Sequence, residues 1–495
     1  MRKKALCAVL SVAMVASMFA ACGSDSSSSS SSSKASSSSS ASDSASASTS
    51  TSDASSSTSD ASDPAESSSA EKIPENKIDG ADTSAANTFV VWGWNQDIKK
   101  ILDGVYKTTN PDDYARIAFL DTGGSNYYQT KLDVILKDSS SDIYPDLMGL
   151  EADYVLKYVQ SDDLLPVSDL GITADDYKNQ YQYNLDLCTD EDGVVKALFW
   201  QATPGAIQVR ADLAEKYLGT TDPDKLQADY FADWDKVVAA AKKVAEASGG
   251  KAMLFPGYNE LMYPFLNSLS TGWYDSNDKL QLDASLDKYF EVAKSFVDDK
   301  SSYNVDQWGE DWGNLKNGDG VETNAAVCYV GCPWFTYWCL DTKWEGNTIL
   351  VKGPTSYYYG GTGLAATKGC SDKEMAGRII KAFTCDKDFM VSLASGKNVD
   401  GWDGNCDFVN NSEATAQLSA DDFTSKYMYG TQSYLDFYSS VLPSISAKAA
   451  VAEQGSINGL FYNQVKEYAN GNKDMDTAKK DFKKAVVDTF SYLSE

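Results

Sequence analysis

Residues 87–120, NTFVVWGWNQDIKKILDGVYKTTNPDDYARIAFL, decide the fold class of this chain. The first part, Asn87–Trp94, is an apolar run typical of a buried strand that ends at Gly93. Residues 97–106 then repeat apolar side chains at helical spacing, and residues 116–120 form a second apolar run. A strand, a helix and another strand in this order predict an α/β fold.

The alternation continues on the C-terminal side of this stretch. We expect further strands at 145–148, 194–200, 205–210, 325–330 and 364–366. We expect further helices at 127–137, from 151, at 212–216, 234–247, from 334, at 373–384 and at 476–493. Because strand–helix–strand units place parallel strands side by side under helices, we expect a parallel sheet covered on both faces.

On the N-terminal side, residues 1–21 have the composition of an export signal. They begin with Met-Arg-Lys-Lys and continue as a short apolar stretch rich in small residues. This stretch is too short for a membrane span of ~20 residues. The segment Phe19–Cys22 resembles a bacterial lipobox, with Phe19 in place of the usual Leu, and this implies lipidation of Cys22. The alternative is an ordinary secretory signal whose cut lies near a cysteine.

Residues 22–86 are expected to form a disordered tether. Ser, Ala, Thr and Asp dominate as far as about Glu71, and these side chains bury too little apolar surface to offset the entropy of ordering. A tail without a spacer role would have the same composition. The later apolar stretch 327–340 is not expected to span a membrane, because Gly331 and Pro333 interrupt it.

Composition narrows the possible functions of the remaining chain. Its roughly 420 residues are too many for one compact core and favour two lobes. A formal charge of −28 argues against nucleic acid as a partner. The absence of histidine excludes Ser-His-Asp and Cys-His nucleophile systems and zinc sites built on imidazole. We expect no metal and no cofactor.

Seven cysteines lie beyond Cys22, and their odd number and wide spacing do not fit a dense disulfide framework. We interpret most of them as small buried hydrophobic side chains. A disulfide between Cys370 and Cys385 is an open alternative in an exported protein.

Five segments together resemble the extracytoplasmic carbohydrate-binding proteins of ABC transporters, the group that includes maltose-binding protein. The segments are VVWGWN at 90–95, PDLMGLEADY at 145–154, DGVVKALFWQATPGAIQVRADLAEK at 192–216, NAAVCYVGCPWF at 324–335, and VKGPTSYYYGGTGLAATKGCSDKEMAGRIIKAF at 351–383. The resemblance covers nearly everything after the tether. It implies a two-lobed α/β fold with a hinge and a ligand cleft between the lobes.

The resemblance also implies where the chain passes between the lobes. We expect the first lobe to contain 87–202 and 325–356, and the second to contain 203–324 and 357–495. The C-terminal helices are expected to pack on both lobes.

Three predicted strands end in side chains suited to a sugar site. Ligands of open α/β sheets bind beyond the carboxyl ends of the strands, and sugars need aromatic surfaces plus polar groups for their hydroxyls. The residues at these three strand ends are Trp94, Asn95, Asp121, Asn126, Glu151 and Asp153. Glu151 has an alternative role as the acidic start of a helix.

The resemblance adds candidates from the other segments. It places the family's sugar-stacking tryptophan at Trp334 and an interlobe crossing at Gly360 and Gly361, beside Tyr359, although the glycines also fit an ordinary turn. Trp200 and Gln201 fall at the first crossing. Loop aromatics and neighbours, which also serve local packing, complete the set: Tyr258, Trp273, Trp308, Trp312, Trp402, Asp403 and Tyr462.

The resemblance implies a non-catalytic, monomeric lipoprotein held at the outer face of the cell membrane. It would bind a carbohydrate, most simply an oligosaccharide, and deliver it to permease subunits. A surface glycosidase is the alternative from another class, because 71 acidic residues make a suitable carboxylate pair unavoidable somewhere. A two-lobed binder of a solute other than sugar is the third possibility.

Overall fold

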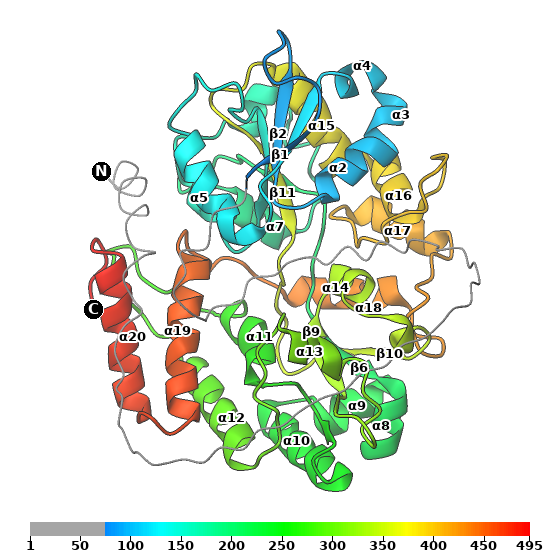
Figure 1. Ribbon diagram of the computed structural model, residues 1–495, viewed down its shortest axis with the longest axis vertical. Helices are drawn as coiled ribbons and strands as arrows, with labels where there is room; N and C mark the ends of the chain where they lie inside the picture. The colour runs from blue at the N-terminus through cyan, green and yellow to red at the C-terminus, as the bar shows by residue number, and fades with distance from the viewer. Residues whose placement is uncertain (1–74) are drawn as a thin grey trace, which may run out of the picture.

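The strand expected at 87–94 forms β2 (Phe89–Gly93), which lies in a six-stranded sheet of the first lobe (Figure 1). The structure is a computed structural model that describes residues 75–495; Cys22 and most of the expected tether lie outside the described residues. β2 runs parallel to its neighbours on both sides. The sheet order is β1 (Lys77–Gly80), β3 (Ile117–Asp121), β2, β4 (Leu147–Glu151), β11 (Thr362–Ala366) and β5 (Leu198–Phe199).

Side chains of β2 point alternately into two cores, as the period of two in a strand requires. Phe89 and Val91 join one core, and Val90 and Trp92 join the other. The sheet is therefore buried on both faces. The helical segments of this lobe are α2 (Asp97–Ile101), η1 (Leu102–Tyr106), α3 (Lys107–Thr109), α4 (Pro111–Tyr114), α5 (Ser125–Ile135), α6 (Val155–Val159), η2 (Val167–Leu170), α7 (Gln182–Cys188), α15 (Lys373–Thr384), α16 (Lys387–Ser395) and α17 (Ser412–Ala420).

The second lobe contains two small sheets. β6 (Ala206–Arg210) pairs antiparallel with β10 (Thr348–Val351) and β9 (Cys328–Gly331), and β7 (Ala252–Met253) pairs parallel with β8 (Ala325–Ala326). Its helical segments are α8 (Ala211–Tyr217), α9 (Pro223–Tyr230), α10 (Trp234–Ser248), η3 (Tyr258–Leu261), α11 (Met262–Leu266), α12 (Leu286–Asp298), α13 (Glu310–Leu315), α14 (Pro333–Trp338), η4 (Thr342–Trp344), α18 (Tyr434–Val441), η5 (Leu442–Ser444), α19 (Gln454–Ala469) and α20 (Met475–Thr489).

The expected lobe boundaries are wrong after residue 324. Residues 325–351 carry β8, β9 and β10, which pair with strands of the second lobe and not with β2 to β4. Conversely, β11 inserts between β4 and β5 of the first lobe, so 357–495 is not a continuous part of the second lobe. Apolar runs indicate that a strand exists, but its partner depends on contacts far apart in the chain.

Two further expectations and one open alternative need correction. The sheet of the first lobe is mixed, because β1, β11 and β5 are antiparallel to their neighbours. The expected tether 22–86 contains β1, whose backbone pairs with the exposed edge of β3 although its own side chains are exposed. The seven described cysteines beyond Cys22 are all free, so Cys370 and Cys385 do not form the disulfide left open above.

Two of the segments that cross between the lobes, 200–205 and 352–361, run beside each other (Figure 1). Gly205 N donates to Tyr357 O at 2.8 Å, and Tyr359 N donates to Thr203 O at 3.0 Å. A Cβ at Gly205 would lie 2.2 Å from the Tyr357 ring, so the close approach of the two segments requires glycine there. These two crossing segments thus form a paired ribbon rather than two independent linkers.

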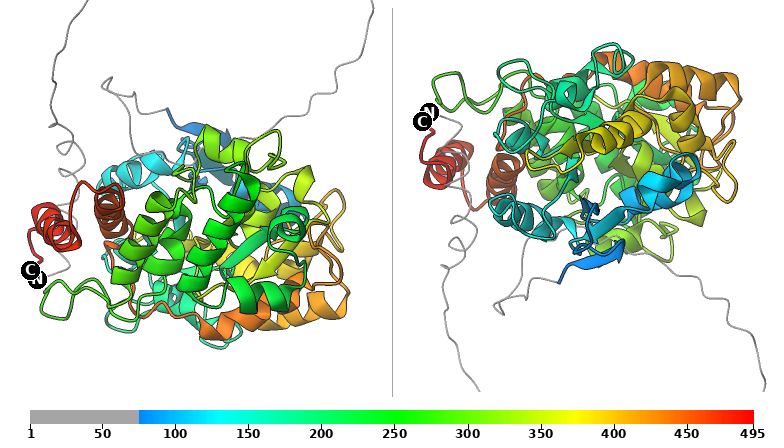
Figure 2. Two further views of the ribbon diagram at one scale, coloured as in Figure 1. Left: turned by 90° about the horizontal axis from the view of Figure 1, so that it is seen from below. Right: turned by 90° about the horizontal axis from the view of Figure 1, so that it is seen from above.

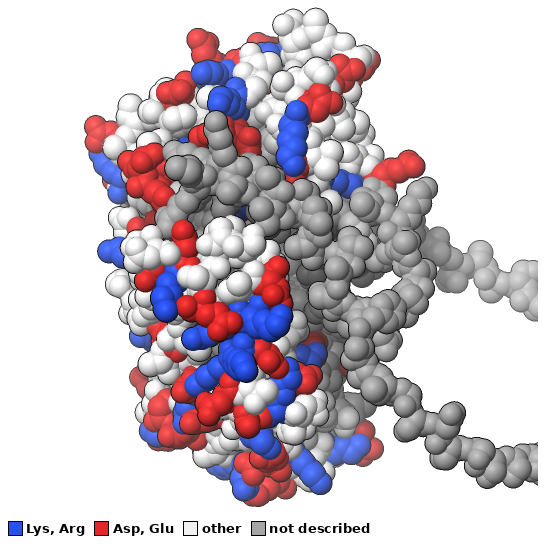
Figure 3. Space-filling view, turned by 90° about the vertical axis from the view of Figure 1, so that its left-hand side faces the viewer, with Lys and Arg blue, Asp and Glu red and all other residues white. Residues whose placement is uncertain are grey.

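The C-terminal helices lie along one side of the molecule. Figure 2 shows α19 and α20 at this edge in both views. The amphipathic pattern of the last helix is confirmed, with Phe482 and Val486 buried. Figure 3 shows Lys and Arg interspersed with Asp and Glu on this side, where Lys479 pairs with Asp287 of α12. This face carries mixed charge and no single-sign patch over its described residues.

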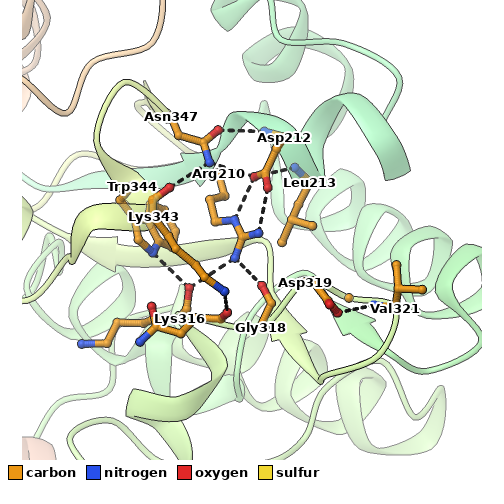
Figure 4. A network of polar contacts seen from close by, with 12 residues as sticks. Arg210, Asp212, Leu213, Lys316, Gly318, Asp319, Val321, Lys343, Trp344 and Asn347 are labelled. Atoms are coloured by element: carbon orange, nitrogen blue, oxygen red, sulfur yellow. Dashed lines mark hydrogen bonds and ion pairs between the residues drawn. The ribbon is translucent and has the colours of Figure 1, made fainter.

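A buried arginine organises the second lobe around its small sheet. Arg210, at the end of β6, directs its guanidinium toward Asp212 and toward the loop that follows α13 (Figure 4). Nε and Nη2 donate to the Asp212 carboxylate at 2.8 Å, and Nη1 donates to the carbonyl oxygens of Lys316 and Gly318 at 3.2 and 2.5 Å. Arg210 therefore satisfies buried carbonyl groups that β6 itself cannot reach.

Within residues 75–495, every helix is too short or too polar to cross a lipid bilayer.

Replacing Arg210 should destabilise the fold. Arg210→Met leaves the Gly318 carbonyl without its donor in a buried position, and the free energy of unfolding should fall by about 2–4 kcal/mol. Arg378→Met is the matched control, because Arg378 pairs with Asp113 on the surface, where such pairs contribute about 1 kcal/mol or less. Urea unfolding of both variants measures the difference. Equal losses in the two variants would show that the Arg210 contacts add nothing beyond a surface pair.

Candidate functional site

Residues from both lobes meet at Gly360 in the second crossing segment. Gly360 has a φ of +62°, and a Cβ there would lie 3.0 Å from Glu151 Oε1 and 3.6 Å from Trp334 Nε1. Glu151 ends β4 of the first lobe, and Trp334 opens α14 of the second lobe. A glycine at 360 therefore lets a carboxylate and an indole from opposite lobes approach the same point.

A second contact between the lobes lies next to the first. Tyr263 of α11 donates its hydroxyl hydrogen to Asp153 Oδ2 at 3.0 Å, and its ring stacks on Tyr359 with a centroid distance of 3.8 Å. The backbone N–H of Gly455 in α19 donates to Asp153 O at 3.2 Å. We call Glu151, Asp153, Tyr263, Trp334, Tyr359 and Gly360 the interlobe site.

The negative charges of the two carboxylates in the interlobe site have little to balance them. Burial raises the pKa of Glu151 well above its ordinary value, and the charge of Asp153 raises it further. Burial also raises the pKa of Asp153, against hydrogen bonds from Tyr263 and Asn267. Within residues 75–495, neither carboxylate forms an ion pair, and Asp153 Oδ1 is buried without a hydrogen-bond donor. The site thus offers acceptor atoms that a ligand with several O–H or N–H groups could pair.

Aromatic side chains form one wall of the interlobe site. Trp334 is half-buried and donates its Nε1 hydrogen to Tyr359 O at 3.2 Å. Trp308, also half-buried, lies nearly parallel to Trp334, with ring centroids 6.2 Å apart and an interplanar angle of 18°. Both indoles keep part of their surface exposed, so this wall could cover the apolar face of a flat ligand.

The residues expected at the ends of β2 and β3 do lie at these strand ends, but their described side chains contact neighbouring residues of the first lobe. Trp94 is half-buried and packs edge-to-face on Tyr128 and Tyr154. Asn95 bonds to Asp97, while Asp121 accepts from Gln96 Nε2 at 2.6 Å and from Gly123 N. The side chain of Asn126 lies outside the described residues. Among the described side chains at the three strand ends, the contacts with the second lobe are those of Glu151 and Asp153.

Several candidates are packed away from any ligand. Trp200 and Trp273 are each 1% exposed, and their Nε1 hydrogens are donated to Asp407 and Asn458. In this conformation neither ring presents a surface to a ligand. Other candidates are also buried or bonded locally: Gln201 bonds to Asp407, Tyr462 to Asp306 and Trp402 to Leu393 O, while Tyr258 and Gly361 are buried. Asp403, by contrast, is exposed.

Two residues that are important to the geometry of the site are indicated only weakly, or not at all, by the amino-acid sequence. Tyr263 lies in the apolar stretch MYPFL, and nothing in that pattern indicates that its hydroxyl reaches the other lobe. Trp308 is one of several loop aromatics in the sequence, but it has a φ of +75°, which is uncommon for a bulky residue. Only the assembled fold singles it out.

A cavity of about 680 Å³ lies elsewhere in the second lobe. It is lined by residues of α13 and of the loop before β8, among them Asn314, Asn317 and Glu322. None of the expected site residues lines it, so it does not coincide with the interlobe site.

Glu151→Gln should stabilise the protein at neutral and alkaline pH. A carboxyl group whose folded-state pKa is raised contributes its full stability below its ordinary value of 4.5 and loses it as the pH rises through the folded value. The neutral amide avoids this loss, so its melting temperature should exceed that of the wild type by a few degrees at about pH 8 and by less at about pH 5. Glu374→Gln, an exposed control on α15, should change neither value. A Glu151→Gln protein that melts lower than the wild type at about pH 8 would contradict this assignment.

Comparison with known proteins supports the fold described above. The model of a family described as bacterial extracellular solute-binding protein matches residues 106–395, which is more than half of the chain. No curated protein matches the sequence.

Solved structures with this fold align over most of the chain. An extracellular solute-binding protein of family 1 has 16% identity and a TM-score of 0.67, covering 82% of this chain and 99% of its own. A binding protein from B. animalis subsp. lactis Bl-04, in complex with β-1,6-galactobiose, has 17% identity and a TM-score of 0.61, covering 83% and 100%. The galacto-N-biose-/lacto-N-biose I-binding protein of Bifidobacterium longum has 15% identity and a TM-score of 0.61, covering 83% and 98%.

The likeness to these structures shows a two-lobed α/β fold, and the match over 106–395 shows the family. The chain belongs to the family of bacterial extracellular solute-binding proteins.

Proposed function

We propose that this protein captures a carbohydrate, most simply an oligosaccharide, between its two lobes and delivers it to the permease of an ABC transporter. The observation that carries the proposal is the interlobe site. There, the half-buried Trp334 of the second lobe and the Glu151 carboxylate of the first lobe meet beside Gly360, and Asp153 accepts a hydrogen bond from Tyr263 of the second lobe.

The chemistry of this site fits a sugar. The apolar C–H face of a pyranose ring packs on an indole, and its hydroxyl hydrogens need acceptors. Trp334 and Trp308 supply aromatic surface, while Glu151 and the unpaired Asp153 Oδ1 supply acceptors. The structures from B. animalis and Bifidobacterium longum were determined with β-1,6-galactobiose and lacto-N-biose, and this likeness supports the same ligand class.

The proposal includes no catalytic step. In a glycosidase, two carboxyl groups flank the scissile bond from opposite sides, as acid and as nucleophile or base. Glu151 and Asp153 instead lie in one turn after β4, where Glu151 Oε2 accepts the backbone N–H of Asp153 at 2.8 Å. This arrangement favours binding over hydrolysis. The paired crossing segments supply a hinge about which the lobes would close on the ligand.

A lipid anchor completes the proposal. We assign lipidation to Cys22 from the lipobox-like segment Phe19–Cys22 and the Ser-rich stretch that follows it. The anchor would hold the protein at the outer face of the cytoplasmic membrane, and the stretch would give the lobes reach to the permease.

Binding and the role of Trp334 can be tested together. Isothermal titration against β-1,6-galactobiose, lacto-N-biose, acarbose and cycloalternan should identify a ligand, which should be recovered chemically unchanged. Trp334→Ala should weaken its binding by at least about tenfold, or ~1.4 kcal/mol, because stacking and buried apolar area are lost together. Trp334→Phe should restore part of the affinity.

Trp338→Ala is the matched control. Trp338 lies on the same helix but is 47% exposed, and Lys100 covers its ring. Its variant should bind as the wild type does. Hydrolysis products at enzyme-like turnover would favour the glycosidase, and exclusive binding of a non-sugar solute would favour the third alternative. Unchanged affinity in a folded Trp334→Ala protein would remove this residue from the site.

The anchor can be tested separately in cells. Wild-type protein should fractionate with membranes, and mass spectrometry of its N-terminal peptide should find a lipid on Cys22. Cys22→Ser should release the protein, because the thiol that accepts the lipid is absent. Wild-type protein found free in the medium and without lipid would overturn the assignment.

A further inference from the structure

A buried carboxylate lies behind the aromatic wall of the interlobe site. Glu260, in η3, has no exposed surface. Its Oε1 accepts the Nε1 hydrogen of Trp312, and its Oε2 accepts from Gln307 Nε2 at 3.1 Å and from Val330 N at 2.9 Å. All three partners are donors, so they match an ionised carboxylate, which is acceptor-only.

These contacts fix both ends of the short segment 307–312. At one end, the backbone N–H of Gln307 donates to Asn259 Oδ1 at 2.9 Å while its side chain reaches Glu260. At the other end, the Trp312 indole reaches the same carboxylate. The segment is therefore anchored at both ends on two adjacent residues of η3.

Trp308 lies between these anchors in a strained conformation. Its φ of +75° is costly for a bulky residue and persists only where the surroundings impose it. In this conformation its ring lies parallel to Trp334 at 6.2 Å. The hydrogen bonds of Glu260 are thus the constraint that supports the place of Trp308 in the aromatic wall.

Glu260 also reaches the rest of the interlobe site through one intermediate. Gln307 Oε1 accepts the hydroxyl hydrogen of Tyr359 at 3.3 Å, and Tyr359 stacks on Tyr263, which donates to Asp153. The Gln307 amide therefore donates to Glu260 on one side and accepts from Tyr359 on the other.

We infer that Glu260 is a positioning residue, which holds Trp308 against Trp334 and Gln307 against Tyr359 and thereby shapes the aromatic wall of the solute site. Its importance for solute capture rests on the proposed function, whereas its effect on the two indoles does not.

This role predicts a dependence on pH. Burial raises the pKa of Glu260 to about 7, against hydrogen bonds from Val330, Trp312 and Gln307 and the charge of Lys316. Protonation of Glu260 adds an O–H group where three donors converge, so one of the three hydrogen bonds must break. The Gln307 amide can turn so that its oxygen accepts the new O–H hydrogen. The hydroxyl group of Tyr359 then loses its acceptor. The other titratable groups within electrostatic reach are Tyr289, Cys328, Tyr329, Cys339, Tyr357 and Tyr359.

Near-ultraviolet circular dichroism tests the inference without any sugar. The difference between the spectra of the wild type and Trp308→Phe isolates the signal of Trp308 in its ordered position. We expect this difference to be large in alkaline buffer and to fall on acidification with a midpoint near pH 7, the pKa of Glu260. In the Glu260→Gln background, Trp308→Phe should produce little difference at any pH. Glu310→Gln, an exposed control on α13, should behave as the wild type.

Two results would overturn the inference. One is a full Trp308 signal in folded Glu260→Gln protein, and the other is a wild-type signal that does not change between about pH 6 and pH 8. The second measurement needs no substitution at Glu260, so it decides the matter even if Glu260→Gln fails to fold. Because no sugar is used, failure here is separate from failure of the sugar titrations.

Discussion

The pairing of the two crossing segments is the constraint on which the rest of this structure depends. The hydrogen bonds between Gly205 and Tyr357 and between Thr203 and Tyr359 hold 200–205 and 352–361 side by side. Each segment leads directly into a strand, β6 in one lobe and β11 in the other. The register of this ribbon therefore sets how the two sheets face each other. Without it, Glu151 and Trp334 would belong to separate surfaces.

Around the ribbon, the interlobe site combines polar groups that are costly to bury with an aromatic wall that is costly to expose. The carboxylates of Glu151 and Asp153 lack ion-pair partners among the described residues, and Trp308 is held in a strained backbone conformation. Such features persist where the surrounding structure imposes them, and they concentrate at functional sites. Glu260 shows how the second lobe supports this arrangement from within its core.

Local patterns in the sequence predicted local structure well. The helix expected at 373–384 is α15 to the residue, because its apolar positions repeat over three turns and Asp372 caps it. Glu151 was predicted because it follows an apolar strand at the edge where ligands of α/β sheets bind, and Trp334 was predicted from the resemblance to the family. The strands that pair with 325–351 could not be predicted, since a buried strand has the same apolar pattern whether its neighbours are parallel or antiparallel. Tyr263 and Glu260 lie in a stretch whose pattern indicates only a buried turn, and their roles depend on contacts across the fold.

The place of β11 has a consequence for how the chain acquires its structure. Thr362 pairs with Glu151, so 211 residues separate these partners (362 − 151), whereas Thr348 pairs with Arg210 across 138 (348 − 210). The sheet of the second lobe can therefore close once residue 351 is available, while that of the first lobe waits for 362–366. Pairings at such separation are slow and leave strand edges open in the meantime. Although β2 lies near the start of the described chain, the sheet that contains it closes after the sheet of the second lobe, and β4 keeps an unpaired edge until β11 arrives.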